Sequence, residues 1–188
     1  DRVKILDQTK LPRDLVYLES SRYQDVVTAI KELKVRGAPA IGVAGAYGVA
    51  VGALAIKARG RESFLEKLQV VIQTIAASRP TARNLFYAME RMSQKIEAES
   101  GSVAELKQAL VDEAIKIHRD EAEGTRKLSE YGAGLIKDGF TILTHCNTGP
   151  LATTGYGTAL GVIIRAKEQG KKLKVIATET RPLLQGAR

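Results

Sequence analysis

Cys146 is the residue of this chain best suited to catalytic chemistry, because it is the single cysteine. It lies one residue beyond the apolar run 140–144, a predicted β-strand, and open α/β sheets bind ligands outside the carboxyl ends of their strands. A thiol there, near a helix N-terminus in a basic protein, is placed to ionise, whereas a thiol with apolar walls would act as a neutral acid. The alternative is a small buried hydrophobe, the usual environment of a free cysteine. Position alone leaves both interpretations open.

Two polar loop segments follow Cys146 and offer groups that bind anions. Asn147-Thr148-Gly149 and the segment 153–158 contain hydroxyls, an amide and flexible backbone. Backbone N–H groups ahead of a helix bind anions well. After Gly155 and Gly157, the GxGxxG fingerprint would need its third glycine at position 160, but that glycine is Gly161. A dinucleotide site is therefore disfavoured. The alternative, that these glycines only permit a tight strand-to-helix turn, stays open.

Three arginines lie at interruptions between predicted elements: Arg36, Arg79 and Arg181. Arginine binds phosphate through two parallel N–H donors, and an arginine before a helix start can join the helix-terminal N–H groups in one anion site. Most single loop arginines are simply solvated, and chain order does not show whether these three converge.

The two histidines are weaker candidates. His118 lies in the charged stretch IKIHRDEAEG and is predicted to be a surface residue. His145 adjoins Cys146, but neighbouring residues in extended chain point to opposite faces, so the two are not paired as a catalytic dyad. Two histidines and one cysteine do not make a typical structural zinc set, and no metal is expected.

Residues 1–137 are predicted to form a mainly helical domain with a small β appendage. Two short strands are joined by a turn around Pro12, and apolar residues at helical spacing follow. The predicted strands span 2–6 and 15–19, and the predicted helices span 23–34, 40–58, 61–78, 85–98 and 103–137. No apolar run is expected to reach the roughly 18 uncharged residues of a membrane helix. The longest candidate, 38–56, is rich in Gly and Ala and is predicted to be buried in a soluble protein.

Residues 138–188 change character and are predicted to begin a Rossmann-like α/β domain. A strand at 140–144, a helix at 158–168 and a strand at 173–177 make a βαβ unit with parallel strands. A parallel sheet of two strands needs its faces and edges covered, so we expect a truncated α/β domain. The fold class is therefore α/β overall.

The charge and composition narrow the class of partner. The net charge of +8 suits an anionic ligand such as a sugar phosphate. Three Phe, six Tyr and no Trp leave little for stacking on bases, so nucleic acid is disfavoured. A lone cysteine and a charged N-terminus without a secretory signal predict a cytoplasmic location.

Four segments together resemble the methylthioribose-1-phosphate isomerases of methionine salvage, in order and in spacing. They are VRGAPAIGVAGAYGVA (35–50), SRPTARNLFYAMERM (78–92), ILTHCNTGPLATTGYGTALGVI (142–163) and ETRPLLQGAR (179–188). The wider family also contains ribose-1,5-bisphosphate isomerases and regulatory subunits of the eukaryotic translation-initiation nucleotide exchange factor. RGAPAIG, SRPTA and THCN together favour the isomerase branch.

The resemblance implies an aldose–ketose isomerase that converts 5-methylthioribose 1-phosphate to 5-methylthioribulose 1-phosphate without a metal or organic cofactor. It implies that Cys146 is one member of an acid–base pair. It implies phosphate binding by the turn Arg36-Gly37-Ala38 and by Arg79, and substrate binding by the Gln185 amide, with Asn147, Thr148 and Gly149 as further loop contacts.

The partner of Cys146 is expected beyond Arg188, where the resemblance puts the catalytic Asp. The 188-residue chain is therefore expected to be inactive alone, and the full-length protein is expected to be a homodimer without nucleic-acid or membrane partners. Two alternatives stay open: a ribose-1,5-bisphosphate isomerase, and a non-catalytic regulatory subunit of the initiation-factor type.

Overall fold

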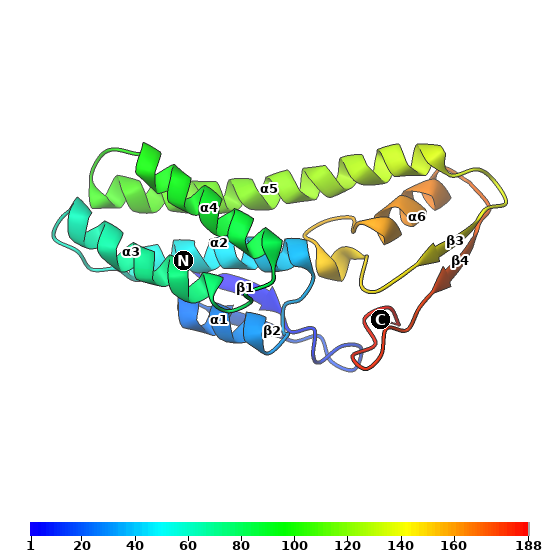
Figure 1. Ribbon diagram of the computed structural model, residues 1–188, viewed down its shortest axis with the longest axis horizontal. Helices are drawn as coiled ribbons and strands as arrows, with labels where there is room; N and C mark the ends of the chain where they lie inside the picture. Colours follow the sequence, from blue (N-terminus) through cyan, green and yellow to red (C-terminus); the bar gives the residue numbers. More distant parts are fainter. Residues whose placement is uncertain (188) are drawn as a thin grey trace. The chain divides into compact units, whose positions relative to one another are not determined.

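A computed structural model describes residues 1–187 of the chain. It contains two compact units, Asp1–His118 and the residues from Arg119 onward, shown in Figure 1. The division lies inside one long helix, α5 (Val103–Leu135), whose first half belongs to the N-terminal unit and whose second half belongs to the C-terminal unit. The boundary predicted from the sequence, at residue 137, stays a prediction and lies just after this helix ends.

The N-terminal unit is a helical bundle with a two-stranded antiparallel sheet, as the sequence predicts. Strands β1 and β2 pair with Val3 opposite Ser20 and Leu6 opposite Tyr17. The elements are β1 (Val3–Leu6), β2 (Tyr17–Ser20), α1 (Tyr23–Lys31), α2 (Ala38–Ala55), α3 (Arg61–Ala76), α4 (Arg83–Ala98) and the start of α5.

Helix α2 is the core of the N-terminal unit and contacts α1, α3 and α4. Its alanines, glycines and valines are apolar on all sides, which is typical of a buried helix. The expectation that no apolar run reaches membrane-spanning length is wrong, because α2 has 18 residues without a charge and would be long enough to cross a bilayer. The predicted burial is confirmed, since 72% of this helix is buried in the protein, as in the core helix of a soluble protein.

The C-terminal unit contains the predicted βαβ arrangement. Its elements are β3 (Thr141–Thr144), a short 3₁₀ turn η1 (Pro150–Ala152), α6 (Ala159–Glu168) and β4 (Lys174–Ala177), together with the second half of α5. Strands β3 and β4 are parallel, with Ile142 opposite Val175 and Thr144 opposite Ala177. Small residues let α6 pack closely on α5, because Gly132 of α5 receives the Val162 side chain.

The two faces of the β3–β4 pair differ. Leu143 and Ile176 lie opposite each other in the register and are exposed. Thr144, Val175 and Ala177 line a cavity at the carboxyl end of the strands. This end is where ligands bind in open parallel sheets, so the fold places the loop that contains Cys146 where a site is expected.

Candidate functional site

Cys146 follows β3 after one intervening residue, His145, and has a left-handed backbone conformation, with φ 68°. A non-glycine residue with positive φ is uncommon, and such residues cluster at functional sites. The Cys146 backbone N–H donates a hydrogen bond to the Thr180 hydroxyl at 3.2 Å. The cysteine is exposed in this chain, which disfavours the alternative interpretation as a small buried hydrophobe.

A cavity of about 180 Å³ opens beside Cys146. It is lined by all five residues that the family resemblance implies for this unit, namely Cys146, Asn147, Thr148, Gly149 and Gln185, whereas Arg181 and the segment 153–158 lie outside its lining. The remaining lining residues are Thr144, Pro150, Leu151, Leu160, Val175, Ala177 and Gly186. The cavity therefore has a polar rim around the thiol and an aliphatic wall. The described lining residues include no Lys, Arg, His, Asp or Glu.

Gln185 contributes an unsatisfied acceptor to this cavity. Its Oε1 atom is buried and has no hydrogen-bond donor among residues 1–187. A buried acceptor without a donor costs about 1–3 kcal/mol, so such groups usually have a partner. A ligand hydroxyl in the cavity would supply that partner.

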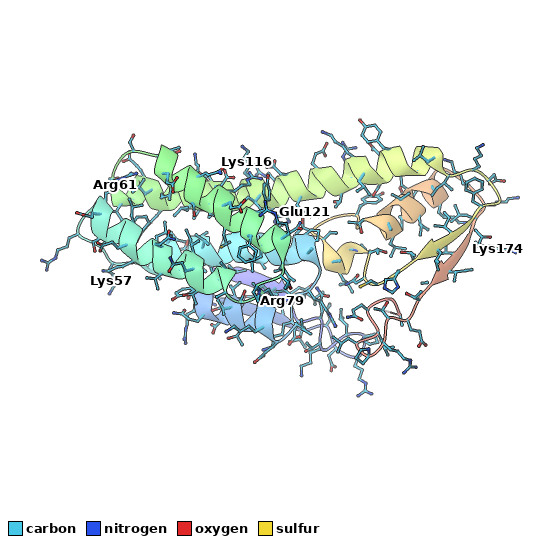
Figure 2. All side chains as sticks on the ribbon, viewed as in Figure 1. Lys57, Arg61, Arg79, Lys116, Glu121 and Lys174 are labelled. Atoms are coloured by element: carbon cyan, nitrogen blue, oxygen red, sulfur yellow. The ribbon has the colours of Figure 1, made fainter. Side chains whose placement is uncertain are left out.

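The glycine-rich segment after η1, residues 153–158, is held in place by hydrogen bonds and packing within the protein. Glu121 of α5, labelled in Figure 2, accepts hydrogen bonds from the Thr154 N–H at 2.8 Å and from the Thr154 hydroxyl. The Thr158 N–H donates to the Thr148 carbonyl at 2.8 Å. A side chain at Gly155 would contact Thr125 and Ala122 of α5. Packing therefore explains this segment, which favours the tight-turn alternative over an anion site made by these amides.

Tyr156 fixes the same segment at its surface. Its hydroxyl donates to both carboxylate oxygens of Glu168, at 2.7 and 2.8 Å. This hydrogen bond lowers the pKa of the Glu168 carboxyl, with a further contribution from Arg165, and it raises the pKa of the Tyr156 phenol. The loop end is thereby tied to the last turn of α6.

The other predicted site residues belong to the N-terminal unit. Gly37 is the N-cap of α2, with φ 101°, a value that glycine adopts without strain and that turns the chain into Ala38. Arg36 is buried and donates from Nη2 to the Gln8 carbonyl at 3.1 Å, which fixes its guanidinium ahead of the helix start.

Arg79 lies in the loop between α3 and α4, as labelled in Figure 2. The first turns of α2 and α4 approach closely, because a Cβ added at Gly42 would lie 2.8 Å from the Asn84 carbonyl oxygen. Helix N-termini have positive dipole ends, and Arg36 and Arg79 precede these two. The N-terminal unit thus brings together two helix starts, with Arg36 two residues before α2 and Arg79 four residues before α4, and helix starts of this kind can bind a phosphate.

Both histidines have partners that the sequence does not reveal. His118, predicted to be a surface residue, is only partly exposed, and its Nδ1 lies 2.9 Å from the Tyr47 hydroxyl. The Nδ1 atom of His145 lies 2.7 Å from the Thr178 hydroxyl. Within residues 1–187 no group of three or more His, Cys, Asp or Glu side chains is arranged to bind a metal ion.

Thr178 and Thr180 are the residues near the cavity that sequence reasoning missed. They follow β4 and bond to His145 and Cys146, which follow β3. A parallel pairing of the two strands predicts that these segments are neighbours, but only the structure shows which atoms meet. Arg181, the third interruption arginine, is exposed and pairs with Glu179 at 2.9 Å.

The chain is similar to several known proteins over its whole length. The methylthioribose-1-phosphate isomerase of Dehalococcoides mccartyi is 58% identical over all of this chain and 56% of its own length. The crystal structure of 5-methylthioribose 1-phosphate isomerase from Pyrococcus horikoshii OT3 has a TM-score of 0.91 at 37% identity, over all of this chain and 52% of that one. The crystal structure of translation initiation factor eIF-2B, subunit delta, from A. fulgidus has a TM-score of 0.86 at 46% identity, over all of this chain and 55% of that one.

The chain spans about half the length of the curated relatives it matches. These likenesses agree with the family resemblance that the four sequence segments indicate. The family model described as the initiation factor 2 subunit family matches residues 34–188, and the chain belongs to that family.

Proposed function

We propose that the protein containing this chain is an aldose–ketose isomerase that converts 5-methylthioribose 1-phosphate to 5-methylthioribulose 1-phosphate. The observation that carries the proposal is the cavity beside Cys146. The residues that the isomerase resemblance predicts for the C-terminal unit are separated by up to 39 positions (185 − 146), and all of them line this one cavity. The relatives named as methylthioribose-1-phosphate isomerases support the same activity.

The chemistry of the substrate explains why an acid–base pair is needed. Its anomeric oxygen carries phosphate, so the ring does not open as a free hemiacetal does. In the net reaction the bond between C1 and the ring oxygen breaks, the ring oxygen gains a proton, the C2 hydroxyl loses one, and the hydrogen on C2 moves to C1. We propose that Cys146 is one of the two groups that exchange these protons, and that an Asp beyond residue 188 is the other.

The aliphatic wall of the cavity favours the methylthio sugar over ribose 1,5-bisphosphate. Leu151, Leu160 and Val175 offer apolar contact for a thioether. A second phosphate would need cationic or helix-terminal partners, and the described lining residues of this cavity include no Lys, Arg or His. For the single phosphate of the substrate, the family resemblance implies binding by the turn Arg36-Gly37-Ala38 and by Arg79.

The second candidate is a regulatory subunit of the initiation-factor type. It is favoured by the 46% identity to the structure described as an eIF-2B subunit delta. Such a protein would keep the fold and would have no need of a thiol in a left-handed backbone at the mouth of a cavity. Turnover separates the two candidates directly.

The test is a turnover assay on the full-length protein with each sugar phosphate in parallel. We expect conversion of 5-methylthioribose 1-phosphate, with ribose 1,5-bisphosphate converted at least tenfold more slowly. Cys146→Ser should abolish turnover while calorimetry still detects substrate binding. Thr141→Ser, at the other end of β3 and outside the cavity lining, is the matched control and should keep wild-type rates. Near-normal turnover by Cys146→Ser would refute the role of the thiol.

We propose in addition that the full-length protein is a cytoplasmic homodimer without a nucleic-acid or membrane partner. The family resemblance supports the dimer, and the lone cysteine suits a reducing compartment. Light scattering on the full-length protein tests the dimer, and a mass corresponding to one chain would refute it.

A further inference from the structure

The loops after β3 and β4 share an unusual backbone conformation. Cys146 has φ 68° and Thr180 has φ 58°. For a β-branched residue such as threonine a positive φ is a genuine outlier, which persists only where the surrounding structure holds it. Asn, Asp or Gly would adopt this conformation with less strain, so the threonine must contribute something that its side chain supplies.

The Thr180 side chain contributes one acceptor, and Cys146 uses it. The hydroxyl oxygen accepts the Cys146 backbone N–H at 3.2 Å. The same oxygen lies 3.3 Å from the Thr178 hydroxyl and 3.5 Å from the Thr178 carbonyl, so its proton also has an acceptor. The hydroxyl is therefore satisfied as both acceptor and donor, with its lone pair directed to the cysteine.

This hydrogen bond extends the strand pairing into the site. The last backbone bond between the two strand ends runs from the Thr178 N–H to the Thr144 carbonyl at 3.2 Å. Two residues further along each segment the chains have left the ladder, and the Thr180 hydroxyl bonds to the Cys146 amide instead of a backbone carbonyl. Thr178 acts in parallel on His145, whose Nδ1 is 2.7 Å from its hydroxyl.

We propose that Thr180 is a positioning residue for the reaction: its hydroxyl holds the Cys146 backbone in the left-handed conformation and so fixes the thiol at the mouth of the cavity. This inference rests on the proposed function, because it assigns to Thr180 the alignment of the thiol assigned there. Thr180 does not line the cavity, so it acts through Cys146 and not on the substrate. Losing about an ångström of alignment at a reacting group can cost on the order of 100-fold in rate.

The experiment compares hydroxyl-free and hydroxyl-bearing variants of the full-length protein. Thr180→Val keeps the shape of the side chain and removes the hydroxyl acceptor. Thr180→Ala removes the hydroxyl and also the β-branched side chain, so it replaces the valine variant if that variant does not fold. We expect both to lower kcat at least fivefold while KM stays within twofold of wild type. Thr180→Ser keeps the hydroxyl and should return kcat to within threefold. Thr141→Val, an exposed threonine at the far end of β3, is the control and should leave kcat unchanged.

A loss of kcat smaller than fivefold in the folded hydroxyl-free variants would overturn the inference. It would also be overturned if Thr180→Ser were as slow as Thr180→Ala, because side-chain bulk and not the hydroxyl would then matter. Hydrogen exchange of residues 145–148 gives a readout independent of turnover, and the Cys146 amide should exchange at least tenfold faster without the hydroxyl. If the wild-type protein converts no sugar phosphate, the proposed function fails. The exchange ratio then tests separately whether the Thr180 hydroxyl holds the Cys146 backbone, and an unchanged rate would refute that contact.

Discussion

Gly42→Ala tests the close approach of the two helix starts that we propose to bind phosphate. A Cβ at this position would lie 2.8 Å from the Asn84 carbonyl oxygen and 3.2 Å from its carbonyl carbon. Carbon atoms prefer separations of about 3.5–4.0 Å, so one helix backbone must shift by roughly 0.5 Å. Such overpacking costs about 1–3 kcal/mol, whereas replacing glycine by alanine in a helix gains about 1 kcal/mol. We therefore expect a net loss of about 1 kcal/mol.

Two other glycines in helices serve as matched controls. A Cβ at Gly48 of the same helix would meet the Ile75 Cδ1 at 3.1 Å and the Val26 Cγ1 at 3.2 Å, which are side-chain tips that can adjust, so Gly48→Ala should be near neutral. Gly124 of α5 has no atom within 4 Å of an added Cβ, and Gly124→Ala should stabilise by up to about 1 kcal/mol.

Urea unfolding followed by far-UV circular dichroism measures the three free energies. The expected order of stability is Gly124→Ala, then Gly48→Ala, then Gly42→Ala. The same displacement should raise KM for the sugar phosphate in Gly42→Ala several-fold and leave it unchanged in Gly48→Ala. If Gly42→Ala is as stable as Gly124→Ala, the two helix starts do not pack as described and the reasoning is refuted.

Two further predictions concern α5. Ser102 and Glu105 form a capping box at its start, in which the Ser102 N–H donates to the Glu105 carboxylate at 2.7 Å. Ser102→Ala should therefore lower the unfolding free energy by about 1 kcal/mol in the same urea assay. An unchanged urea midpoint would contradict the cap. Arg126 pairs with Glu123 at 2.7 Å and lowers the pKa of that carboxyl to about 2. Because the folded pKa is below the ordinary value of 4.5, the stabilisation is present above that value and is lost as pH falls toward 2. Urea midpoints between pH 5 and 2.5 should therefore fall less in Arg126→Gln than in wild type, and equal slopes would contradict this.

Local signals in the sequence predicted most of the elements. The helix predicted at 61–78 is α3, Arg61–Ala76, and the strand predicted at 173–177 is β4, Lys174–Ala177. Such elements can be predicted because their signals are local. These signals are the periodic spacing of apolar residues and the Gly or Pro residues that interrupt it. The parallel pairing of β3 and β4 follows from the intervening helix, and it correctly placed the Cys146 loop at the carboxyl end of the sheet.

Polar contacts between distant segments could not be predicted in this way. Glu121 bonds to Thr154, 33 positions away, and Cys146 bonds to Thr180, 34 positions away. Each depends on the exact rotation of an element about its axis, which no pattern of residue types specifies. The left-handed conformation of Thr180 even opposes its local preference, because β-branched residues disfavour positive φ.

The glycine-rich segments show how the same residue type serves packing in one place and the site in another. At Gly155 an added side chain would meet Thr125 and Ala122, and at Gly161 it would meet Ser129, so both glycines let α5 approach. At Gly149 it would meet Leu160 at 2.9 Å, inside the cavity lining. A side chain at Gly149 would therefore fill the site, whereas one at Gly155 or Gly161 would displace the loop or α6 from α5. The position of the cavity thus depends on how closely α5 packs, which makes this helix part of the construction of the site although none of its residues lines it.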